Sequence, residues 1–255
     1  MAEPLLRLES LSKRFGGIVA TDQLSLDILE GELHAVIGPN GAGKTTLIAQ
    51  LAGQLAPDSG RVRFAGDDIT AVPAWRRSIL GLARSFQITS LFLDFTALDN
   101  VALAVQAHVG HSFRFWRDAR SEAELREPAR ETLARVGLAD RADVQVANLS
   151  HGEHRQLEIA LALASRPRML LLDEPMAGLG PEESARMVAL LRALKRDLTI
   201  LLVEHDMEAV FALADRITVM VYGRVIASDV PEAIRADEAV RQAYLGEQQA
   251  VARHG

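Results

Sequence analysis

The chain has 255 residues, of which 49% are apolar and 24% are charged, and it carries a formal net charge of −6 with no cysteine. This length suits one α/β domain with a smaller subdomain and is too short for two such domains in tandem. The negative charge argues against nucleic acid as the main partner, because binding to a phosphate backbone rests on clustered Lys and Arg. The lack of cysteine excludes disulfides and thiol chemistry.

No segment of the sequence approaches the roughly 18 continuous apolar residues of a membrane-spanning helix. The two richest runs, Met169 to Leu172 and Leu198 to Val203, have the length of buried strands. The N-terminal residues MAEPLLRLES contain Glu3 and lack a basic flank or a long apolar region, so they do not have the pattern of a secretory signal. We therefore expect a cytoplasmic protein that reaches a membrane only through a partner.

The first third of the chain has the pattern of β-strands. Leu5 to Glu9 and Leu24 to Ile28 alternate apolar and polar residues, as half-buried strands do. A third such run, Arg61 to Phe64, follows a turn formed by Pro57 to Gly60. These runs predict a small antiparallel sheet.

A glycine-rich motif follows the apolar run Leu33 to Ile37. The sequence GPNGAGKT from Gly38 to Thr45 matches G-x-x-x-x-G-K-[ST] in full and lies between a predicted strand and a predicted helix, as a phosphate-binding P-loop does. Its glycines let successive backbone N–H groups turn toward an anion, and the positive end of the next helix faces the same phosphates. Lys44 supplies an ammonium for the β- and γ-phosphates, and the Thr45 hydroxyl is placed to bind Mg²⁺. The candidate nucleotide-binding residues here are Gly38, Pro39, Asn40, Gly41, Ala42, Gly43, Lys44, Thr45 and Thr46.

Residues from about 91 to 165 have the pattern of helices. Asp99 is the predicted N-cap of a helix that includes Val101, and a second amphipathic stretch runs from Glu122 to Val136. We expect these helices to form a subdomain that also contains the motif near residue 150.

The order strand, helix, strand follows over 169–172, 184–196 and 198–203. Continuously apolar strands in this order are typical of a parallel sheet covered on both faces. We therefore predict an α/β fold with a P-loop NTPase core and a parallel sheet, an N-terminal antiparallel β subdomain and an inserted α-helical subdomain. The chain would form a single domain over 1–255 that ends in a helical tail from about 231 to 255.

Four more motifs follow the P-loop in order. Gln87 ends the segment ARSFQ, LSHGE from Leu149 to Glu153 opens a helix, LLLDEP from Leu170 to Pro175 ends a buried strand, and His205 stands just after the next strand. Together with the P-loop, these motifs resemble the nucleotide-binding subunit of an ATP-binding cassette (ABC) transporter. The resemblance covers nearly the whole chain.

The resemblance implies a set of roles around ATP. Asp173, at the carboxyl end of a strand, suits coordination of Mg²⁺, since this hard cation prefers oxygen ligands. Glu174 matches the carboxylate that polarises the attacking water, and His205 matches the histidine that contacts the γ-phosphate. Gln87 matches the residue that touches Mg²⁺ and the attacking water. Phe15 lies where the family places an aromatic that stacks on adenine, although a simple core aromatic is the alternative.

The segment LSHGE is similar to the signature LSGGQ, whose serine and glycine backbone bind the γ-phosphate of ATP held by the opposite subunit. Ser150 and Gly152 match this signature, whereas His151 and Glu153 depart from its commonest form. A further departure is Gly180, where many members have Asp in the loop that crosses the dimer interface.

Within the family, the pattern is most similar to the ATP-binding subunit of branched-chain amino acid importers. The resemblance rests on RFGG at 14–17, RSFQ at 84–87, LEIA at 157–160, AGL at 177–179, VEHDM at 203–207 and AYLGE at 243–247. It implies ATP and Mg²⁺ as ligands, a homodimer or a heterodimer with a similar subunit, membrane permease subunits that contact the segment 87–95, and indirectly a periplasmic solute-binding protein. Importers of urea, short amides or aromatic acids share much of the pattern, and the ATPase of a lipopolysaccharide-type exporter is an alternative. A non-transport ABC ATPase is disfavoured, because the chain lacks tandem cassettes, long coiled-coil insertions and basic surfaces.

Overall fold

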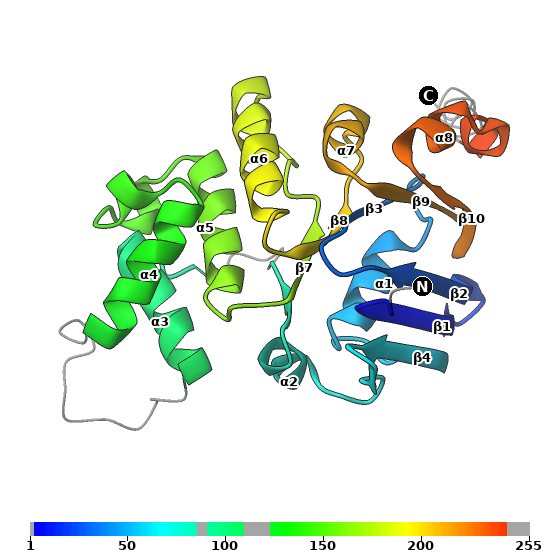
Figure 1. The fold of residues 1–255 in the computed structure, drawn as a ribbon, viewed down its shortest axis with the longest axis horizontal. Coiled ribbons are helices and arrows are strands. Elements are labelled where there is room, and N and C mark those ends of the chain that lie inside the picture. The colour runs from blue at the N-terminus through cyan, green and yellow to red at the C-terminus, as the bar shows by residue number, and fades with distance from the viewer. Residues whose placement is uncertain (1–2, 86–90, 110–122, 244–255) are drawn as a thin grey trace.

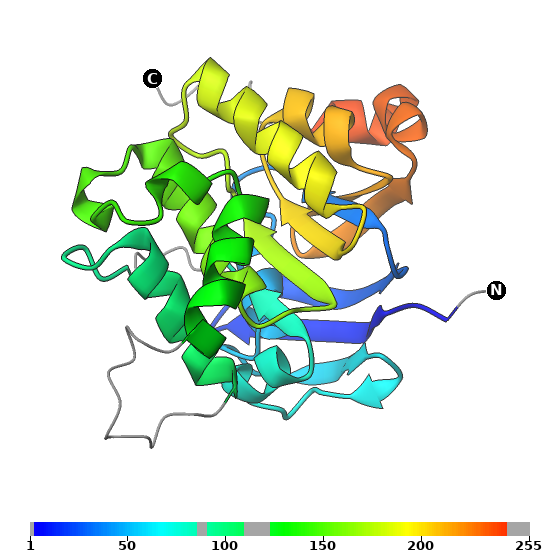
Figure 2. The same ribbon diagram turned by 60° about the vertical axis from the view of Figure 1, so that its left-hand side comes forward.

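The computed structural model describes residues 3–85, 91–109 and 123–243. In these residues, the strands form one sheet of six and one sheet of four. The helices flank the larger sheet. Helices α3 (Ala97–Val109), α4 (Ala123–Arg135) and α5 (His151–Leu163) lie together at one end of the molecule in Figure 1 and remain a group in the turned view of Figure 2. This arrangement confirms the predicted α/β class, with a parallel sheet beside an antiparallel one.

The larger sheet has the strand order β10-β9-β3-β8-β7-β6. Adjacent strands in this sheet are parallel, apart from the antiparallel pair of β10 and β9 at one edge. Every residue of β3, β7 and β8 is buried, which is why their sequences are apolar apart from His34, Asp173 and Thr199. The bounds are β3 Leu33–Ile37, β6 Leu82–Arg84, β7 Met169–Asp173, β8 Thr199–Val203, β9 Arg216–Val221 and β10 Arg224–Asp229.

Alternate residues of the central strands contribute to different parts of the core, since successive side chains of a strand point to opposite faces. Leu170 and Leu172 of β7 join the core that includes α5 and α6. Leu171 of the same strand joins the core beneath the other face, which includes α1 and the smaller sheet. The helices outside the α3–α5 group are α1 Lys44–Leu51, α2 Ala74–Ile79, α6 Pro181–Leu194, α7 Met207–Leu213 and α8 Pro231–Ala236.

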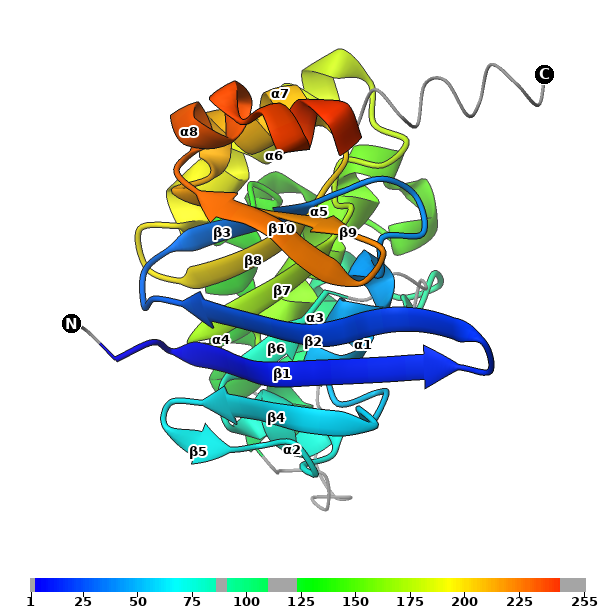
Figure 3. The same ribbon diagram turned by 90° about the vertical axis from the view of Figure 1, so that its right-hand side faces the viewer.

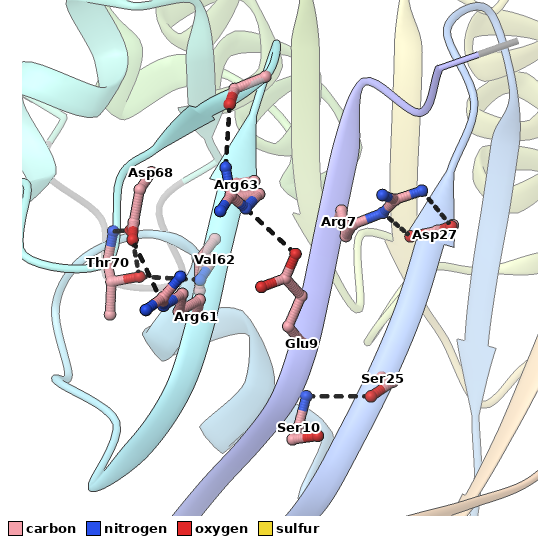
Figure 4. Close-up of polar contacts among 11 residues, drawn as sticks. Arg7, Glu9, Ser10, Ser25, Asp27, Arg61, Val62, Arg63, Asp68 and Thr70 are labelled. Atoms are coloured by element: carbon pink, nitrogen blue, oxygen red, sulfur yellow. Dashed lines mark hydrogen bonds and ion pairs between the residues drawn. The ribbon is translucent and has the colours of Figure 1, made fainter.

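The smaller sheet is antiparallel, with the order β2-β1-β4-β5. Its two long strands face the viewer in Figure 3. Polar cross-strand contacts link the strands, as Figure 4 shows: Arg7 Nε pairs with Asp27 Oδ1 at 2.9 Å, and Arg63 Nε with Glu9 Oε1 at 3.1 Å. The side chains of both pairs are partly exposed, so the apolar face over α1 contributes most of the stability. The bounds are β1 Leu6–Phe15, β2 Ile18–Ile28, β4 Ser59–Phe64 and β5 Asp67–Asp68.

Helices α3 (Ala97–Val109), α4 (Ala123–Arg135) and α5 (His151–Leu163) pack against one another. The predicted N-cap of α3 is wrong by three residues: the Thr96 hydroxyl accepts the hydrogen bond from the Asp99 backbone N–H at 3.0 Å, so Thr96 is the cap. The Asp99 carboxylate instead pairs with Arg126 of α4 at 2.9 Å. In the described part of the chain, no helix combines the length and the apolar character needed to cross a membrane.

Candidate functional site

The P-loop connects β3 to α1 and is packed between the two sheets. A Cβ on Gly38 would overlap the backbone oxygen of Met220 in β9, and a Cβ on Gly43 would overlap that of Ala20 in β2. The two glycines have φ angles of 156° and 101°. Only glycine therefore fits at these two positions, for reasons of space as well as of backbone conformation.

Lys44 begins α1 and its side chain turns back over the loop. Its Nζ donates to the backbone oxygens of Gly38 at 2.6 Å and of Pro39 at 3.1 Å. No side-chain hydrogen bond from the described residues caps the N-terminus of α1. In this part of the chain, the backbone N–H groups of the first turn have no side-chain cap to displace, which suits binding of an anion, and the lysine ammonium lies beside them.

Asp173 ends β7 and lies beside Arg84 of β6. Its Oδ2 accepts a hydrogen bond from Arg84 Nη2 at 3.0 Å, whereas its buried Oδ1 has no hydrogen-bond partner among the described residues. Burial raises the pKa of the Asp173 carboxyl above its ordinary value, and the charge of neighbouring Glu174 raises this pKa further. Arg84 lowers the pKa, but by less than burial raises it. Arg84 also contacts Gln54.

The chemistry of this corner fits Mg²⁺. An unpartnered buried carboxylate oxygen and a threonine hydroxyl on the adjacent P-loop helix are the oxygen donors that this ion takes beside substrate phosphates. The described residues hold no group of three or more His, Asp or Glu side chains that could bind a metal ion by themselves, so phosphate oxygens would have to complete the coordination.

Glu174 and His205 follow neighbouring strands and meet at the carboxyl edge of the sheet. Glu174 has a φ of 51°, an uncommon conformation for a residue with a side chain, and its backbone N–H donates to Val203 O at 2.8 Å. The Nδ1 of His205 lies 3.9 Å from Glu174 Oε1 and 3.6 Å from Glu204 Oε2. The imidazole is 64% exposed and the Glu174 side chain 36%, so both groups can reach a bound molecule.

The segment LSHGE forms the N-terminus of α5. Ser150 is the N-cap: its hydroxyl accepts from the Glu153 N–H at 3.2 Å, and the Glu153 carboxylate accepts from the Ser150 N–H at 2.7 Å. The two hydrogen bonds form a complete capping box. His151 donates through Nε2 to Ala177 O at 3.4 Å, in the loop after β7. Both departures from the commonest signature thus have a local structural role.

Two carboxylates that the sequence analysis did not single out lie among these residues. Glu183 in the first turn of α6 accepts hydrogen bonds from the N–H groups of Gly152 at 3.2 Å and of Gly180 at 3.4 Å. Its position three residues after Gly180 is the spacing of a capping box, which is a readable signal. Glu204 is fully buried and bonds to the loop after Glu174. Nothing in the sequence around Glu204 indicates this contact.

The remaining predicted residues are placed as follows. Phe15 ends β1 and is 49% exposed, with Lys13 Nζ 5.7 Å from the ring centre, so it is not a core aromatic. Its stacking on adenine stays a prediction. Gln87 and most of the tail motif at 243–247 lie outside the described residues.

A P-loop between a parallel sheet and an antiparallel one, together with an inserted helical group that carries its own capped serine motif, defines the class of ATP-binding cassettes. The family described as ABC transporter matches residues 21–177, and the family described as branched-chain amino acid ATP-binding cassette transporter matches residues 224–250. The chain belongs to the ABC transporter family and is one of its ATPases.

Two curated relatives match the chain along their whole length. The high-affinity branched-chain amino acid transport ATP-binding protein BraF of Pseudomonas aeruginosa is 39% identical, with 97% of this chain and 100% of BraF covered. The protein LivG of Salmonella typhimurium, which has the same description, is 37% identical over the same shares. The ADP conformation of MJ1267, an ATP-binding cassette of an ABC transporter, superposes with a TM-score of 0.84 at 31% identity, covering 95% of this chain and 99% of that one. A dimeric post-hydrolysis state of the cassette MJ0796 bound to ADP and Pi gives a TM-score of 0.73 at 25% identity, covering 89% and 98%.

Proposed function

We propose that this chain is the ATP-hydrolysing subunit of an importer for branched-chain amino acids. The observation that carries the proposal is full-length similarity to two proteins named for that transport, together with a match of residues 224–250 to the family of that name. In this proposal the chain is peripheral on the cytoplasmic face of the cell membrane and is held there by permease subunits. A periplasmic solute-binding protein delivers the cargo, which never touches the chain.

Binding of ATP would begin at the P-loop. The triphosphate takes the place of the Gly38 and Pro39 oxygens as the partner of the Lys44 ammonium, and the N–H groups of the loop and of the first turn of α1 surround it. Thr46 follows in the same turn. The half-exposed ring of Phe15 offers a face for adenine.

Thr45 and Asp173 would hold Mg²⁺, with Gln87 as a further ligand. When bound, the ion adds positive charge beside the β- and γ-phosphates. Arg84 holds Asp173 in place through one carboxylate oxygen and leaves the other unpartnered among the described residues.

Hydrolysis would use the pair at the edge of the sheet. The Glu174 carboxylate orients the attacking water and draws on its proton, and a positioned base of this kind contributes about 10²- to 10⁴-fold. His205, 3.9 Å from Glu174, contacts the γ-phosphate. Exposure of both side chains is consistent with a site that a second subunit completes.

The second subunit would be another copy or a similar chain, bound head to tail around two ATP molecules. Its Ser150, His151, Gly152 and Glu153 would lie over the γ-phosphate of the ATP held by the first P-loop. The Ser150 hydroxyl at the positive N-terminus of α5 supports this role. In the single chain, the N–H groups of Ser150, Gly152 and Glu153 donate to side chains of the same chain, so the γ-phosphate would replace these acceptors when the dimer closes. The dimeric description of MJ0796 supports the arrangement by analogy.

The permease would contact the segment 87–95. Phe92, Leu93 and Phe95 in this segment are 57%, 51% and 38% exposed, and the rings of Phe92 and Phe95 lie 5.4 Å apart. Exposed apolar side chains in a cluster are typical of a contact surface.

The experiment is ATPase activity of the complex reconstituted with its permeases. A binding protein loaded with leucine, isoleucine or valine should raise turnover, because it stimulates only by favouring the permease state in which the two ATPases close. Stimulation confined to urea or an aromatic acid would retain import and remove the branched-chain cargo. Coupling to a lipid-exporting permease without any binding protein would remove import itself.

A further inference from the structure

Glu204 is a buried carboxylate at the end of β8, with 0% of its surface exposed. Its Oε1 accepts a hydrogen bond from the backbone N–H of Met176 at 2.8 Å. Its Oε2 accepts from the backbone N–H groups of His205 at 2.8 Å and of Asp206 at 3.2 Å. One side chain therefore joins the loop after β7 to the loop after β8.

These contacts require an anion with two acceptor oxygens. A buried carboxylate loses its hydration, and charge-assisted hydrogen bonds from N–H groups offset that loss. Glutamine has the same shape but carries one oxygen and one NH₂ group. In its place, an N–H donor would face another donor at one end of the contact, and a buried polar group would lose its partner.

The two loops joined by Glu204 are those of Glu174 and His205. Glu174 precedes Met176 by two residues and is held in its uncommon backbone conformation by the hydrogen bond to Val203 O. That bond fixes the start of the loop, and the bond from Met176 N–H to Glu204 fixes its continuation. The hydrogen bond from the His205 backbone N–H to the same carboxylate fixes the backbone that carries the imidazole.

We propose that Glu204 is a positioning residue for ATP hydrolysis, whose buried carboxylate sets the separation of Glu174 and His205 by joining the loops that carry them. The inference rests on the proposed function, in which these two side chains act on one ATP. Because Glu204 is fully buried, it would act through these loops and not by contact with the nucleotide. A displacement of about 1 Å in such a pair costs up to about 10²-fold in rate.

The test is Glu204→Gln, measured alone and in a His205→Ala background. We expect Glu204→Gln to lower kcat by about 10- to 100-fold while the Kd for ATP stays within about threefold of wild type. In the His205→Ala background, single-turnover assays should show a clearly smaller further loss, because part of what Glu204 positions is then already absent. An equal loss in both backgrounds, or a kcat of Glu204→Gln within about twofold of wild type, would overturn the inference.

A matched control separates positioning from stability. Glu32 is also a buried carboxylate that accepts a backbone N–H, from Leu29 at 3.0 Å, and it precedes β3 at the opposite edge of the sheet. Glu32→Gln should lower thermal stability and leave kcat unchanged. If both variants lower kcat in proportion to their loss of stability, Glu204 is structural only. Should Glu204→Gln not fold, Glu204→Asp keeps the charge but is one methylene too short for both loops, and the same fall in kcat is expected.

Glu174→Gln distinguishes this inference from the proposed function. If Glu174→Gln retains wild-type hydrolysis, the proposed site itself is wrong. If Glu174→Gln is inactive while Glu204→Gln is normal, only the role of Glu204 is wrong.

Discussion

The Glu183 carboxylate accepts a hydrogen bond from the backbone N–H of Gly152 at 3.2 Å, and a Cβ on Gly152 would come within 2.7 Å of its Oε1. The first turn of α6 is therefore linked to the first turn of α5 within one chain. Gly152 leaves room for this carboxylate, so the glycine of the signature has a function in the isolated subunit as well as any role toward a partner's ATP.

A double-mutant cycle tests this packing. Alanine is favoured over glycine within a helix by roughly 0.5 to 1 kcal/mol, but in wild type the new methyl group would displace Glu183. Gly152→Ala should therefore be more stabilising in a Glu183→Ala background than in wild type, by about 1 kcal/mol. Urea unfolding without nucleotide measures both values, and strictly additive effects would contradict the contact.

Glu174→Gln should stop hydrolysis without preventing ATP binding. The amide keeps the shape of the side chain but removes the charge that orients water, so we expect hydrolysis to fall by at least about 10²-fold. The ATP-bound dimer should accumulate, which size-exclusion chromatography with Mg-ATP detects. Wild-type turnover in this variant would mean that another group is the base.

Head-to-tail pairing predicts complementation between two inactive variants. Ser150→Arg places a bulky cation where the opposite γ-phosphate would bind, while Lys44→Ala removes the point charge of the P-loop. A mixed dimer of the two variants contains one composite site with neither lesion. It should trap nucleotide at that site, whereas neither homodimer has an intact site.

The controls are the two homodimers and a mixed dimer of wild type with Lys44→Ala. If the mixed dimer of Ser150→Arg with Lys44→Ala traps no nucleotide, and crosslinks join the two P-loops, head-to-tail pairing is excluded.

Glu32 gives the protein a stability that depends on pH. Burial raises the pKa of its carboxyl, but the hydrogen bonds from His34 and from the Leu29 N–H, with charges on His34 and Arg216, outweigh burial and leave the pKa below its ordinary value. Such a group stabilises the fold above the pKa of the unfolded chain, about 4.3, and loses this contribution as the pH falls through the lower native pKa.

Glu32→Gln should thus reduce the free energy of unfolding by about 1 to 3 kcal/mol near neutral pH. The difference from wild type should shrink as the pH falls below about 4. Urea titrations of both proteins across this range provide the measurement, and a difference that is independent of pH would show that the charge of Glu32 contributes nothing.

The strands and the P-loop were predictable because each depends on a local pattern. The run at 169–172 is apolar at every position, and the run at 198–203 is apolar except at Thr199, because both faces of β7 and β8 are covered. The N-cap of α3 was not fixed by local pattern, since Thr96 and Asp99 are both good caps. In the structure, Thr96 caps the helix and Asp99 pairs with Arg126, a contact between helices that the local sequence does not show.

The contact of Glu204 with Met176 could not be predicted. It joins residues 28 apart in sequence and depends on the parallel pairing of β7 with β8, in which Asp173 lies opposite Val203. For the same reason, the sequence predicted that Glu174 and His205 act together but not what holds them at their separation. Gln87 lies outside the described residues, so its place in the site stays a prediction.

Because Gly38 and Gly43 are crowded, selection for folding and selection for nucleotide binding act on different glycines of the P-loop. Any side chain at these positions would press on a carbonyl of β9 or of β2, so it would damage folding before it affected nucleotide. At Gly41 an added Cβ would meet nothing within 4 Å, and only the φ of 78° opposes a substitution. Substitutions of Gly38 or Gly43 should therefore lower the amount of protein in the cell. A substitution of Gly41 can abolish transport activity while the protein still accumulates.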